Sequence, residues 1–542
     1  MPPLSAPPAP PAPPRTPAPG RVRTPRRSRS RARLAALAVP LVPALFALVL
    51  GVWGLSRGHS VWRDEAATWQ TSLRTVPQIW HMLGQVDAVH GLYYLLMHGL
   101  FTVFGDGTTT LRLPSVLAVA AAAAFVALTG ARLGRTGPGI LRSSGRWAGI
   151  GAGLTLALLP AVQFHAQEGR PYALVTAGAA VATWLLVRAL DGAGPGRRGL
   201  WVAYGLALLA CALLNWFSLL VPAAHAVTLA WVRADRALLR RWAAATAAAV
   251  AGALPLVLFS RSQAGQVSWI PATTWHTLIG PGALLLAGGA CALVRPPRAV
   301  RLTAASVGLP LLAVPQLALI LASLVKPLYL DRYVLFSMLG VALPAGHAMA
   351  ALVRAAAARG LRSAGLIVPV TAGVALVAML PLERAYREPG SRVDDVLSAA
   401  GEVARLKRPG DGVVFVPAAR RDTALVSPHA FAGLTDLALA VGPAESGTLK
   451  GVEADPATIC AAMRHHLRIL LVTDAGARPK PLANERDRTK AEVLRQWFHP
   501  VADTQVRGRR VTVYEVAGPD RRDRGDHRAI SGEPSPAPRI HC

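Results

Sequence analysis

The sequence has 542 residues, of which 52% are hydrophobic and 16% are charged, and its mean hydropathy is +0.37. Soluble globular proteins carry about 25% charged residues. Here the apolar residues come in long blocks, so the composition excludes a soluble protein and indicates a polytopic membrane protein. The formal net charge of +29 does not indicate nucleic-acid binding, because the arginines cluster in short loops between apolar blocks, as in the cytoplasmic loops of membrane proteins.

Residues 1–33 consist mainly of Pro, Ala, Arg and Ser. This composition cannot form a core, and we expect a disordered basic tail in the cytoplasm. The apolar segment 34–56 is long enough to cross a bilayer, which takes about 20 residues. A cleaved signal peptide is the alternative, but the apolar run is too long for one and ends without a small-x-small site. Residues 57–111 are then a large extracytoplasmic loop.

Two helices are predicted inside this loop, at 76–86 and 90–104. The second, HGLYYLLMHGLFTVF, is shorter than the roughly 20 residues of a membrane span. We therefore expect it to lie at the membrane interface. If it crossed the membrane instead, every later loop would change sides.

The apolar blocks that follow complete a predicted total of eleven spans. With the 90–104 helix at the interface, nearly all loop arginines fall on the cytoplasmic side, as the positive-inside rule requires. The predicted spans after the first are 112–131, 147–165, 171–190, 200–215, 217–232, 242–260, 276–294, 302–325, 333–352 and 363–382. The multi-span part of the chain is thus 34–382.

Residues 383–517 alternate helical and strand patterns, which predicts a small α/β domain with a largely parallel sheet. An odd number of spans places this domain outside the cytoplasm. It contains no Gly-x-Gly-x-x-Gly motif and no phosphate-binding loop, so nucleotide binding is not indicated. The predicted helices are 393–406, 458–466 and 488–498, the predicted strands are 412–416, 468–473 and 510–516, and residues 518–542 are expected to be disordered.

Three sets of polar residues are predicted to meet on the outer face. They lie in the loop 57–111, in QEGRPY after the span 147–165, and in KPLYLDRY before the span 333–352. Charge near hydrocarbon is costly and usually functional, although the adjacent pair of acids in the first set could simply mark a solvated loop. The candidate residues are Asp64, Glu65, Asp87, His90 and Tyr93 in the first set, Glu168, Arg170 and Tyr172 in the second, and Lys326 and Arg332 in the third.

These residue types are suited to a site that binds a phosphate group and a hydroxyl group side by side. Arginine presents a planar fork that matches phosphate oxygens, and a carboxylate can take a proton from an attacking hydroxyl. A polyprenyl-phosphate sugar needs both groups, together with a groove between helices for its lipid tail. The pattern therefore favours a site for a lipid-linked sugar at the outer membrane face.

Five segments carry a resemblance to a known group of enzymes. In order, WRDEA, DAVHGLYYLLMH, LRLPS, QEGRPYAL and LDRY resemble the membrane glycosyltransferases of the GT-C fold, in particular the bacterial relatives of protein O-mannosyltransferases (glycosyltransferase family 39). The resemblance covers residues 50–390 and carries no function onto the α/β domain. It implies a multi-pass enzyme of the bacterial plasma membrane that moves a sugar, often mannose, from polyprenyl phosphate to a hydroxyl of a protein, glycolipid or cell-wall polymer, with inversion.

The resemblance also implies roles for the candidate residues. Asp64 matches the general base, Glu65 is a neighbouring or second acid, and Glu168 orients the acceptor or the sugar. Some GT-C enzymes hold a divalent metal, and Asp64 with Glu168 could bind Mg²⁺ or Mn²⁺, but this branch is not expected to need one. The candidates for the donor phosphate are Arg170, Arg332 and Lys326, and those for the cavity lining are Asp87, His90, Tyr93 and Tyr172.

Other interpretations remain open. Arg170 could anchor a helix among the lipid headgroups, and Tyr93 could belong to an interfacial aromatic belt. A transporter or lipid flippase would place ionisable groups near the middle of its spans, often in inverted repeats, whereas acids are scarce in these spans. A non-catalytic assembly or binding protein that uses the outer α/β domain predicts that Asp64 and Glu168 can be replaced without effect.

Overall fold

The computed structural model describes residues 26–135, 140–192, 197–263, 265, 269–294, 301–476, 482 and 484–517. It divides into two compact units, Met1–Ala38 and Val39–Cys542, and the contacts described below lie within the second. The predicted tail 518–542 and residues 1–25 of the predicted tail 1–33 lie outside the described residues. Helix α1 (Arg26–Val52) begins inside the range of that N-terminal tail.

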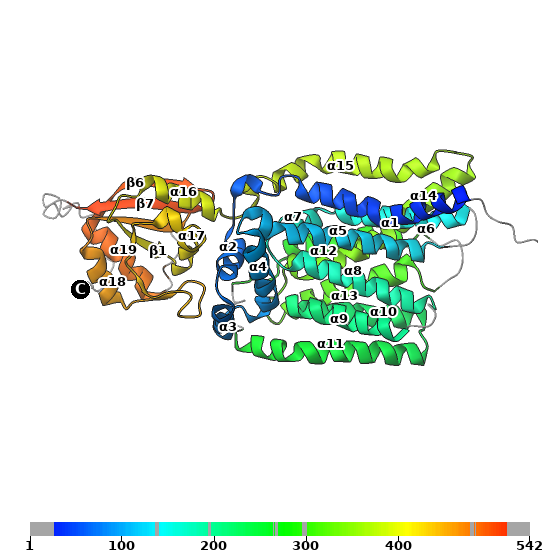
Figure 1. The fold of residues 1–542 in the computed structure, drawn as a ribbon, viewed down its shortest axis with the longest axis horizontal. Helices are drawn as coiled ribbons and strands as arrows, with labels where there is room; N and C mark the ends of the chain where they lie inside the picture. The colour runs from blue at the N-terminus through cyan, green and yellow to red at the C-terminus, as the bar shows by residue number, and fades with distance from the viewer. Residues whose placement is uncertain are drawn as a thin grey trace, which may run out of the picture. The chain divides into compact units, whose positions relative to one another are not determined.

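Helices make up the first three quarters of the described chain. In Figure 1 the long helices run side by side, and three shorter ones, α2 to α4, are set across one end of them. After α1, the helices are α2 (Arg63–Ser72), α3 (Val76–Gln85), α4 (Gly91–Phe104), α5 (Thr108–Leu133), α6 (Ile140–Leu158), α7 (Pro160–Ala166), α8 (Tyr172–Leu190), α9 (Arg197–Leu214), α10 (Leu220–Val232), α11 (Arg236–Ser262), α12 (Trp275–Ala292), α13 (Ala304–Ser323), α14 (Leu339–Ala358) and α15 (Ile367–Tyr386).

Seven helices of the described residues are long and apolar enough to cross a membrane, or eight if the bent pair α6 and α7 counts as one span. Each predicted span coincides with a helix, so a polytopic helical membrane fold is confirmed. The remaining predicted spans fall on helices that are shorter or less apolar, namely α9, α10 and α12, and the total of eleven stays a prediction. The predicted interfacial helix is η2 (Ala88–His90) followed by α4.

The bend between α6 and α7 follows from one residue. The two helices meet at 63°, and Leu159 between them is extended, with ψ of 125°. Pro160 has no N–H to continue the helix and disfavours the helical conformation in the residue before it. The same proline is well placed at the first position of the next helix, so α7 turns away and ends beside the segment Gln167–Pro171.

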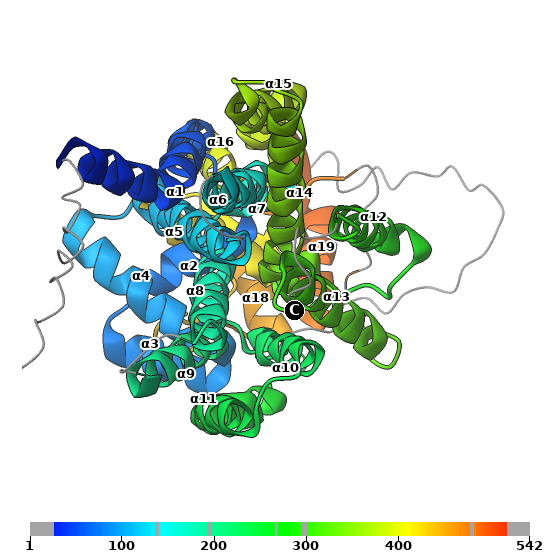
Figure 2. The same ribbon diagram turned by 90° about the vertical axis from the view of Figure 1, so that its right-hand side faces the viewer.

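Small residues let the central helices approach closely. Figure 2 shows α6 beside both α5 and α14. A Cβ atom built on Gly149 of α6 would lie 2.4 Å from the carbonyl oxygen of Ala127, and one built on Gly346 of α14 would lie 2.3 Å from that of Ala148. Such close crossings of small residues are typical of packed membrane helices.

The C-terminal part, after α15, is an α/β domain as predicted, but its sheet is mixed. The strand order is β2-β1-β5-β7-β6, with β1 parallel to β2 and β5, and β7 antiparallel to β5 and β6. The expectation of a largely parallel sheet is wrong, because the polar strand β6 was not foreseen and returns β7 in the opposite direction. The elements are α16 (Val396–Leu406), β1 (Gly412–Val416), α17 (Asp422–Val426), β2 (Thr435–Asp436), β3 (Leu439–Val441), β4 (Val452–Glu453), α18 (Pro456–Arg464), β5 (Arg468–Asp474), α19 (Glu485–Trp497), β6 (Phe498–Val506) and β7 (Arg509–Val516).

Helices cover both faces of this sheet. Successive strand residues point to opposite faces, and in β1 Val413 and Phe415 pack with Val403 of α16. Between them, Val414 points the other way and packs with Ile459 of α18. A continuous apolar run is typical of such a doubly covered strand, which explains why GVVFV could be recognised in the sequence.

Candidate active site

Residues far apart in the sequence meet around the start of helix α2. The Asp64 carboxylate lies 3.5 Å from Nη1 of Arg332, and the Asp64 carbonyl oxygen accepts a hydrogen bond of 3.3 Å from Arg170. All three predicted sets of polar residues therefore contribute to one site. It is built from α2, from the segment between α7 and α8, and from the helical turns Asp331–Met338 that precede α14.

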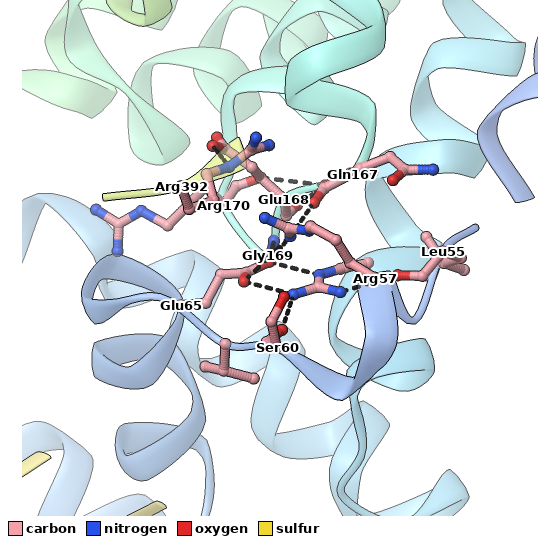
Figure 3. Close-up of polar contacts among 12 residues, drawn as sticks. Leu55, Arg57, Ser60, Glu65, Gln167, Glu168, Gly169, Arg170 and Arg392 are labelled. Atoms are coloured by element: carbon pink, nitrogen blue, oxygen red, sulfur yellow. Dashed lines mark hydrogen bonds and ion pairs between the residues drawn. The ribbon is translucent and has the colours of Figure 1, made fainter. Parts of the chain in front are cut away.

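Glu65 lies beneath this site and is fully buried. Both of its oxygens accept hydrogen bonds of 2.7 Å from Arg112 of α5, and Arg57 lies 3.3 Å away on the same carboxylate. The backbone N–H of Gly169 adds a bond of 3.0 Å (Figure 3). The Glu65 carboxylate is thus fully engaged by two guanidinium groups and one amide.

The charges around Glu65 fix its ionisation. Burial alone would raise the pKa of this carboxyl, but the positive charges of Arg112 and Arg57 and the hydrogen bonds to Arg112 and Gly169 outweigh burial and lower it. A carboxylate that is held ionised, and whose two oxygens already accept hydrogen bonds, is a poor proton acceptor. Glu65 therefore links three parts of the chain: α2, α5 and the segment between α7 and α8 that contains Gly169.

Glu168 is also buried, near the start of the segment between α7 and α8. It pairs with His165 at 2.7 Å and with Arg392, which follows α15, at 3.0 Å (Figure 3). Burial raises the pKa of Glu168, but His165 and Arg392 outweigh it and hold the pKa at about 2. Like Glu65, this acid is ionised and fully partnered.

Asp64 differs from both of these acids. Its side chain is 24% exposed, and Arg332, its ion-pair partner, is 16% exposed. At 3.5 Å the pair is looser than the 2.7 Å contact between Arg112 and Glu65. Of the three predicted catalytic acids, Asp64 is the one with a carboxylate accessible to a substrate.

Arg170 is held beside Asp64 by a histidine. Its Nη2 donates to Nε2 of His90 at 3.0 Å, which makes His90 the acceptor at that nitrogen, while Nδ1 of His90 lies 3.7 Å from Asp87. Burial and the nearby Arg170 cation lower the pKa of His90, so the ring is neutral. Asp87 also accepts a 2.7 Å hydrogen bond from Tyr94, so the predicted residues Asp87, His90 and Arg170 form one connected group.

Aromatic rings surround Arg332. Its guanidinium carbon lies 5.9 Å from the ring centres of both Tyr172 and Tyr333 and 5.6 Å from that of Trp269. Tyr172 is buried, whereas Trp269 is 59% exposed. Arg332 therefore has Asp64 on one side and aromatic faces on others, an arrangement that favours a cation.

Two predicted residues stand apart from these contacts. Tyr93 is fully buried, and its hydroxyl has no hydrogen-bond partner among the described residues. Lys326 is exposed just after α13, and its ammonium group makes no hydrogen bond or ion pair with the site residues described above. The structure does not bring Lys326 to the site, whereas it does bring Arg332 from the same segment.

Comparison with known proteins gives the fold. No protein-family model and no curated protein matches the chain. Among solved structures, ArnT from Cupriavidus metallidurans in the apo state is similar, with 16% identity and a TM-score of 0.54 over 90% of this chain and 98% of that one. The structure of ArnT bound to undecaprenyl phosphate is similar over the same shares of both chains, with 15% identity and a TM-score of 0.56. The chain has the GT-C fold.

Within the GT-C fold, the likeness covers the α/β domain as well as the membrane helices, because it extends over 90% of the chain. The sequence resemblance, by contrast, covers only residues 50–390. The assignment to glycosyltransferase family 39 stays a prediction.

The sequence did not reveal the partners of the buried acids. Arg112 stands in the LRLPS segment, and that position was the available signal for it. Arg57 looked like one of many basic residues near the end of a span. Arg392 belongs to the link between the membrane helices and the α/β domain, where nothing in its neighbours marks it. His165 ends an apolar span and could have been a core histidine.

A divalent metal does not fit the residues present. Among the described residues, no group of three or more His, Cys, Asp or Glu side chains could hold one. Of the two oxygen donors considered for Mg²⁺ or Mn²⁺, Glu168 has both oxygens engaged by His165 and Arg392, and Asp64 is paired with Arg332.

Proposed function

We propose that this protein is a membrane glycosyltransferase that moves a sugar from a polyprenyl-phosphate donor to an acceptor hydroxyl. The observation that carries the proposal is Asp64, a partly exposed carboxylate next to two arginines in a chain of the GT-C fold. The ArnT structure with undecaprenyl phosphate supports a polyprenyl phosphate as the lipid carrier. A hexose, with mannose first, remains our choice of sugar from the sequence resemblance.

In the proposed reaction, Asp64 is the general base. It takes the proton of the acceptor hydroxyl while the oxygen attacks the anomeric carbon of the sugar. The new glycosidic bond forms as the bond from that carbon to the phosphate oxygen breaks, and the electron pair of the broken bond leaves with the polyprenyl phosphate. Attack from the face opposite the leaving group inverts the anomeric configuration. A positioned base of this kind contributes about 10²–10⁴-fold in rate.

Arg332 and Arg170 are the proposed partners of the donor phosphate. Arg332 is 16% exposed beside Asp64, and its Nε has no hydrogen-bond partner among the described residues. Arg170 is buried, and its Nε is likewise without one. Guanidinium groups already in place stabilise the negative charge that grows on the leaving phosphate. Lys326 would act only after a movement toward the site.

Glu65 and Glu168 have a supporting role in this proposal. Their arginine partners hold α2, α5 and the segment between α7 and α8 together, and so they fix the positions of Asp64 and Arg170. This replaces the expectation that Glu65 is a second acid and that Glu168 orients the substrate. Asp87 and His90 hold Arg170, Tyr172 packs against Arg332, and the exposed Trp269 provides a face against which a sugar ring can pack.

The test uses the purified full-length protein in nanodiscs with radiolabelled polyprenyl-phosphate mannose and other polyprenyl-phosphate sugars. Extracted membrane lipids and proteins serve as acceptors. Asp64→Asn should lower donor consumption by about 10²–10⁴-fold, and a chelator should have no effect. Asp106→Asn is the matched control, because Asp106 is an exposed aspartate at the end of the same outer loop.

Two outcomes would contradict the proposal. Equal turnover by wild type and Asp64→Asn would remove Asp64 from the mechanism. No consumption of any donor by the wild type would favour the non-catalytic reading, in which the α/β domain serves in assembly or binding.

A further inference from the structure

Helix α2, which carries Asp64, begins without a cap of its own. Its N-cap residue is Trp62, whose side chain makes no capping hydrogen bond. The first N–H groups of a helix have no partner inside the helix, and a side-chain oxygen usually supplies one. Here the Arg63 N–H donates at 3.0 Å to the carboxylate of Asp394, from the segment that leads into α16.

The neighbouring backbone extends this contact. The Val61 N–H donates to Asp395 at 3.3 Å, and the Val61 carbonyl oxygen accepts from the Val396 N–H at 2.7 Å. The Arg63 side chain also donates to Asp394, at 3.0 Å. Val61 and Arg63, on either side of Trp62, are therefore both bonded to the first residues of the α/β domain.

Asp394 is itself fixed by the body of the α/β domain. It is buried and pairs at 3.0 Å with Arg509 of β7, which is fully buried. Arg509 also forms a two-armed ion pair with Asp422 of α17, at 2.7 and 2.8 Å. A bidentate arginine pair of this kind has a defined geometry, so the position of the Asp394 carboxylate is set by the sheet and by α17.

We infer that Asp394 is a positioning residue for the catalytic helix: it caps α2 from the α/β domain and fixes the place of Asp64 relative to Arg332. A carboxylate at a helix N-terminus is favourable to the helix dipole as well as to the N–H group. The α/β domain is by this inference a working part of the active site. The expected effect on kcat rests on the proposed function, whereas the expected effect on the stability of the start of α2 does not.

The first measurement is hydrogen exchange of the full-length protein in nanodiscs, which needs no substrate. Asp394→Asn keeps an oxygen for the Arg63 N–H but removes the charge, whereas Asp394→Ala removes both. We expect exchange in the peptide 61–72 to rise about tenfold in Asp394→Asn and further in Asp394→Ala, because opening of the helix start becomes easier. If the alanine variant does not fold, the asparagine variant still decides.

The matched control is Asp411→Asn. Asp411 is also a buried aspartate of the α/β domain; it accepts from the Arg408 N–H at 2.7 Å and pairs with Arg468. It has the same kind of partners but does not contact α2. Asp411→Asn should loosen its own surroundings and leave exchange of the peptide 61–72 within about twofold of wild type. Equal exchange of this peptide in Asp394→Asn and Asp411→Asn would overturn the inference.

The second measurement is kinetic. Asp394→Asn should lower kcat about tenfold while KM for the donor changes by less than about threefold, because misplaced Asp64 weakens the transition state more than donor binding. In an Asp64→Asn background, Asp394→Asn should cost no further rate. A fall in kcat of the same size in Asp411→Asn would overturn the inference, whereas a wild type without transferase activity would overturn the proposed function and leave the exchange result to decide the inference.

Discussion

Asp64 and Glu65 are adjacent in the sequence, yet their side chains have opposite surroundings. On a helix, successive residues point about 100° apart, so one carboxylate reaches the accessible site and the other enters the protein. Glu65 meets Arg57 and Arg112 there. A pair of neighbouring acids can thus divide the work: one is available for a proton, and the other holds the frame.

Glu65→Gln should be strongly destabilising. The change leaves two buried guanidinium groups without their carboxylate, and breaking a buried ion pair in this way costs about 3–5 kcal/mol. Asp64→Asn is the matched comparison, because its partly exposed pair contributes about 1 kcal/mol or less. Thermal unfolding in detergent should show a large drop in midpoint for Glu65→Gln and little change for Asp64→Asn. Equal midpoints for the two variants would mean that Glu65 is not a structural charge.

The ionised state of Glu168 gives the stability a defined pH dependence. Its pKa is lowered in the folded protein from 4.5 to about 2. A carboxyl group whose pKa is lower in the folded than in the unfolded protein stabilises the fold at pH values above its unfolded pKa. This stabilisation is lost as the pH falls through the folded-state pKa. The contribution of Glu168 should therefore be constant above about pH 5 and decline from about 4.5 toward 2.

This is measured as the unfolding midpoint from pH 8 to 3. Wild type should lose stability steeply below about pH 4.5, and Glu168→Gln should start lower at neutral pH and fall less steeply. Glu402→Gln on α16 is the control, since Glu402 is only partly buried and its partner Arg405 is 60% exposed. A Glu168→Gln profile parallel to that of wild type would contradict the assignment.

At the scale of elements, patterns that are local in the sequence were predictable. The strand Gly412–Val416 was placed with its observed ends, and the helix expected at 76–86 is α3, Val76–Gln85. Its start is marked in the sequence, since Thr75 and Gln78 form a capping box with a proline in the first turn. Strong periodicity and caps are sufficient for such elements.

Elements that depend on distant partners were missed. Strand β6 contains Pro500 and polar residues such as Asp503, and it is a strand because it pairs with β7 at the edge of the sheet. Strands β2 and β4 have two residues each, too few for a pattern. The links from Glu65 to Arg112 and from Glu168 to Arg392 were missed for the same reason: each joins segments that only the tertiary fold brings together.

Two glycine substitutions should have opposite effects, because one glycine lies at the close contact of α6 and α14 and the other lies on α12 with open space around it. In Gly346→Ala the new methyl group would meet the backbone of α6, at 2.3 Å from the Ala148 oxygen, and overpacking of this kind costs about 1–3 kcal/mol or more. In Gly289→Ala on α12 nothing lies within 4 Å, and the better helix propensity should stabilise by up to about 1 kcal/mol. Unfolding midpoints and monodispersity in detergent check both, and tolerance of Gly346→Ala would show that these helices can separate.

At the scale of the whole molecule, the membrane helices were predictable because hydropathy and charge bias are strong signals along a chain. The GT-C fold was predicted from the resemblance of five short segments and not from these signals. The orientation in the membrane stays a prediction. It depends on α4 lying at the interface, and the loop arginines are the argument for it.

Cysteine labelling checks this orientation. Ala404 on α16 and Ser363 before α15 are both exposed and are expected on opposite sides of the membrane. In intact cells, a membrane-impermeant maleimide should label Ala404→Cys above the wild-type background and should label Ser363→Cys only after permeabilisation. The reverse result would mean that the whole molecule is inverted and that the site faces the cytoplasm, because Asp64 before α4 contacts Arg170 and Arg332 after it and must lie on their side of the membrane.

The contacts of Arg392, Asp394 and Arg509 also bear on how the protein is made. A ribosome delivers the chain from its N-terminus, so the membrane helices, Asp64 and Glu168 are synthesised before any of these three residues. Until Arg392 and Asp394 are made, Glu168 lacks its arginine and α2 lacks its cap. Until β7 folds, Asp394 lacks its anchor Arg509. By the inference above, a nascent or prematurely stopped chain would insert into the bilayer yet remain idle, and completion of the C-terminal domain would be the event that switches the enzyme on.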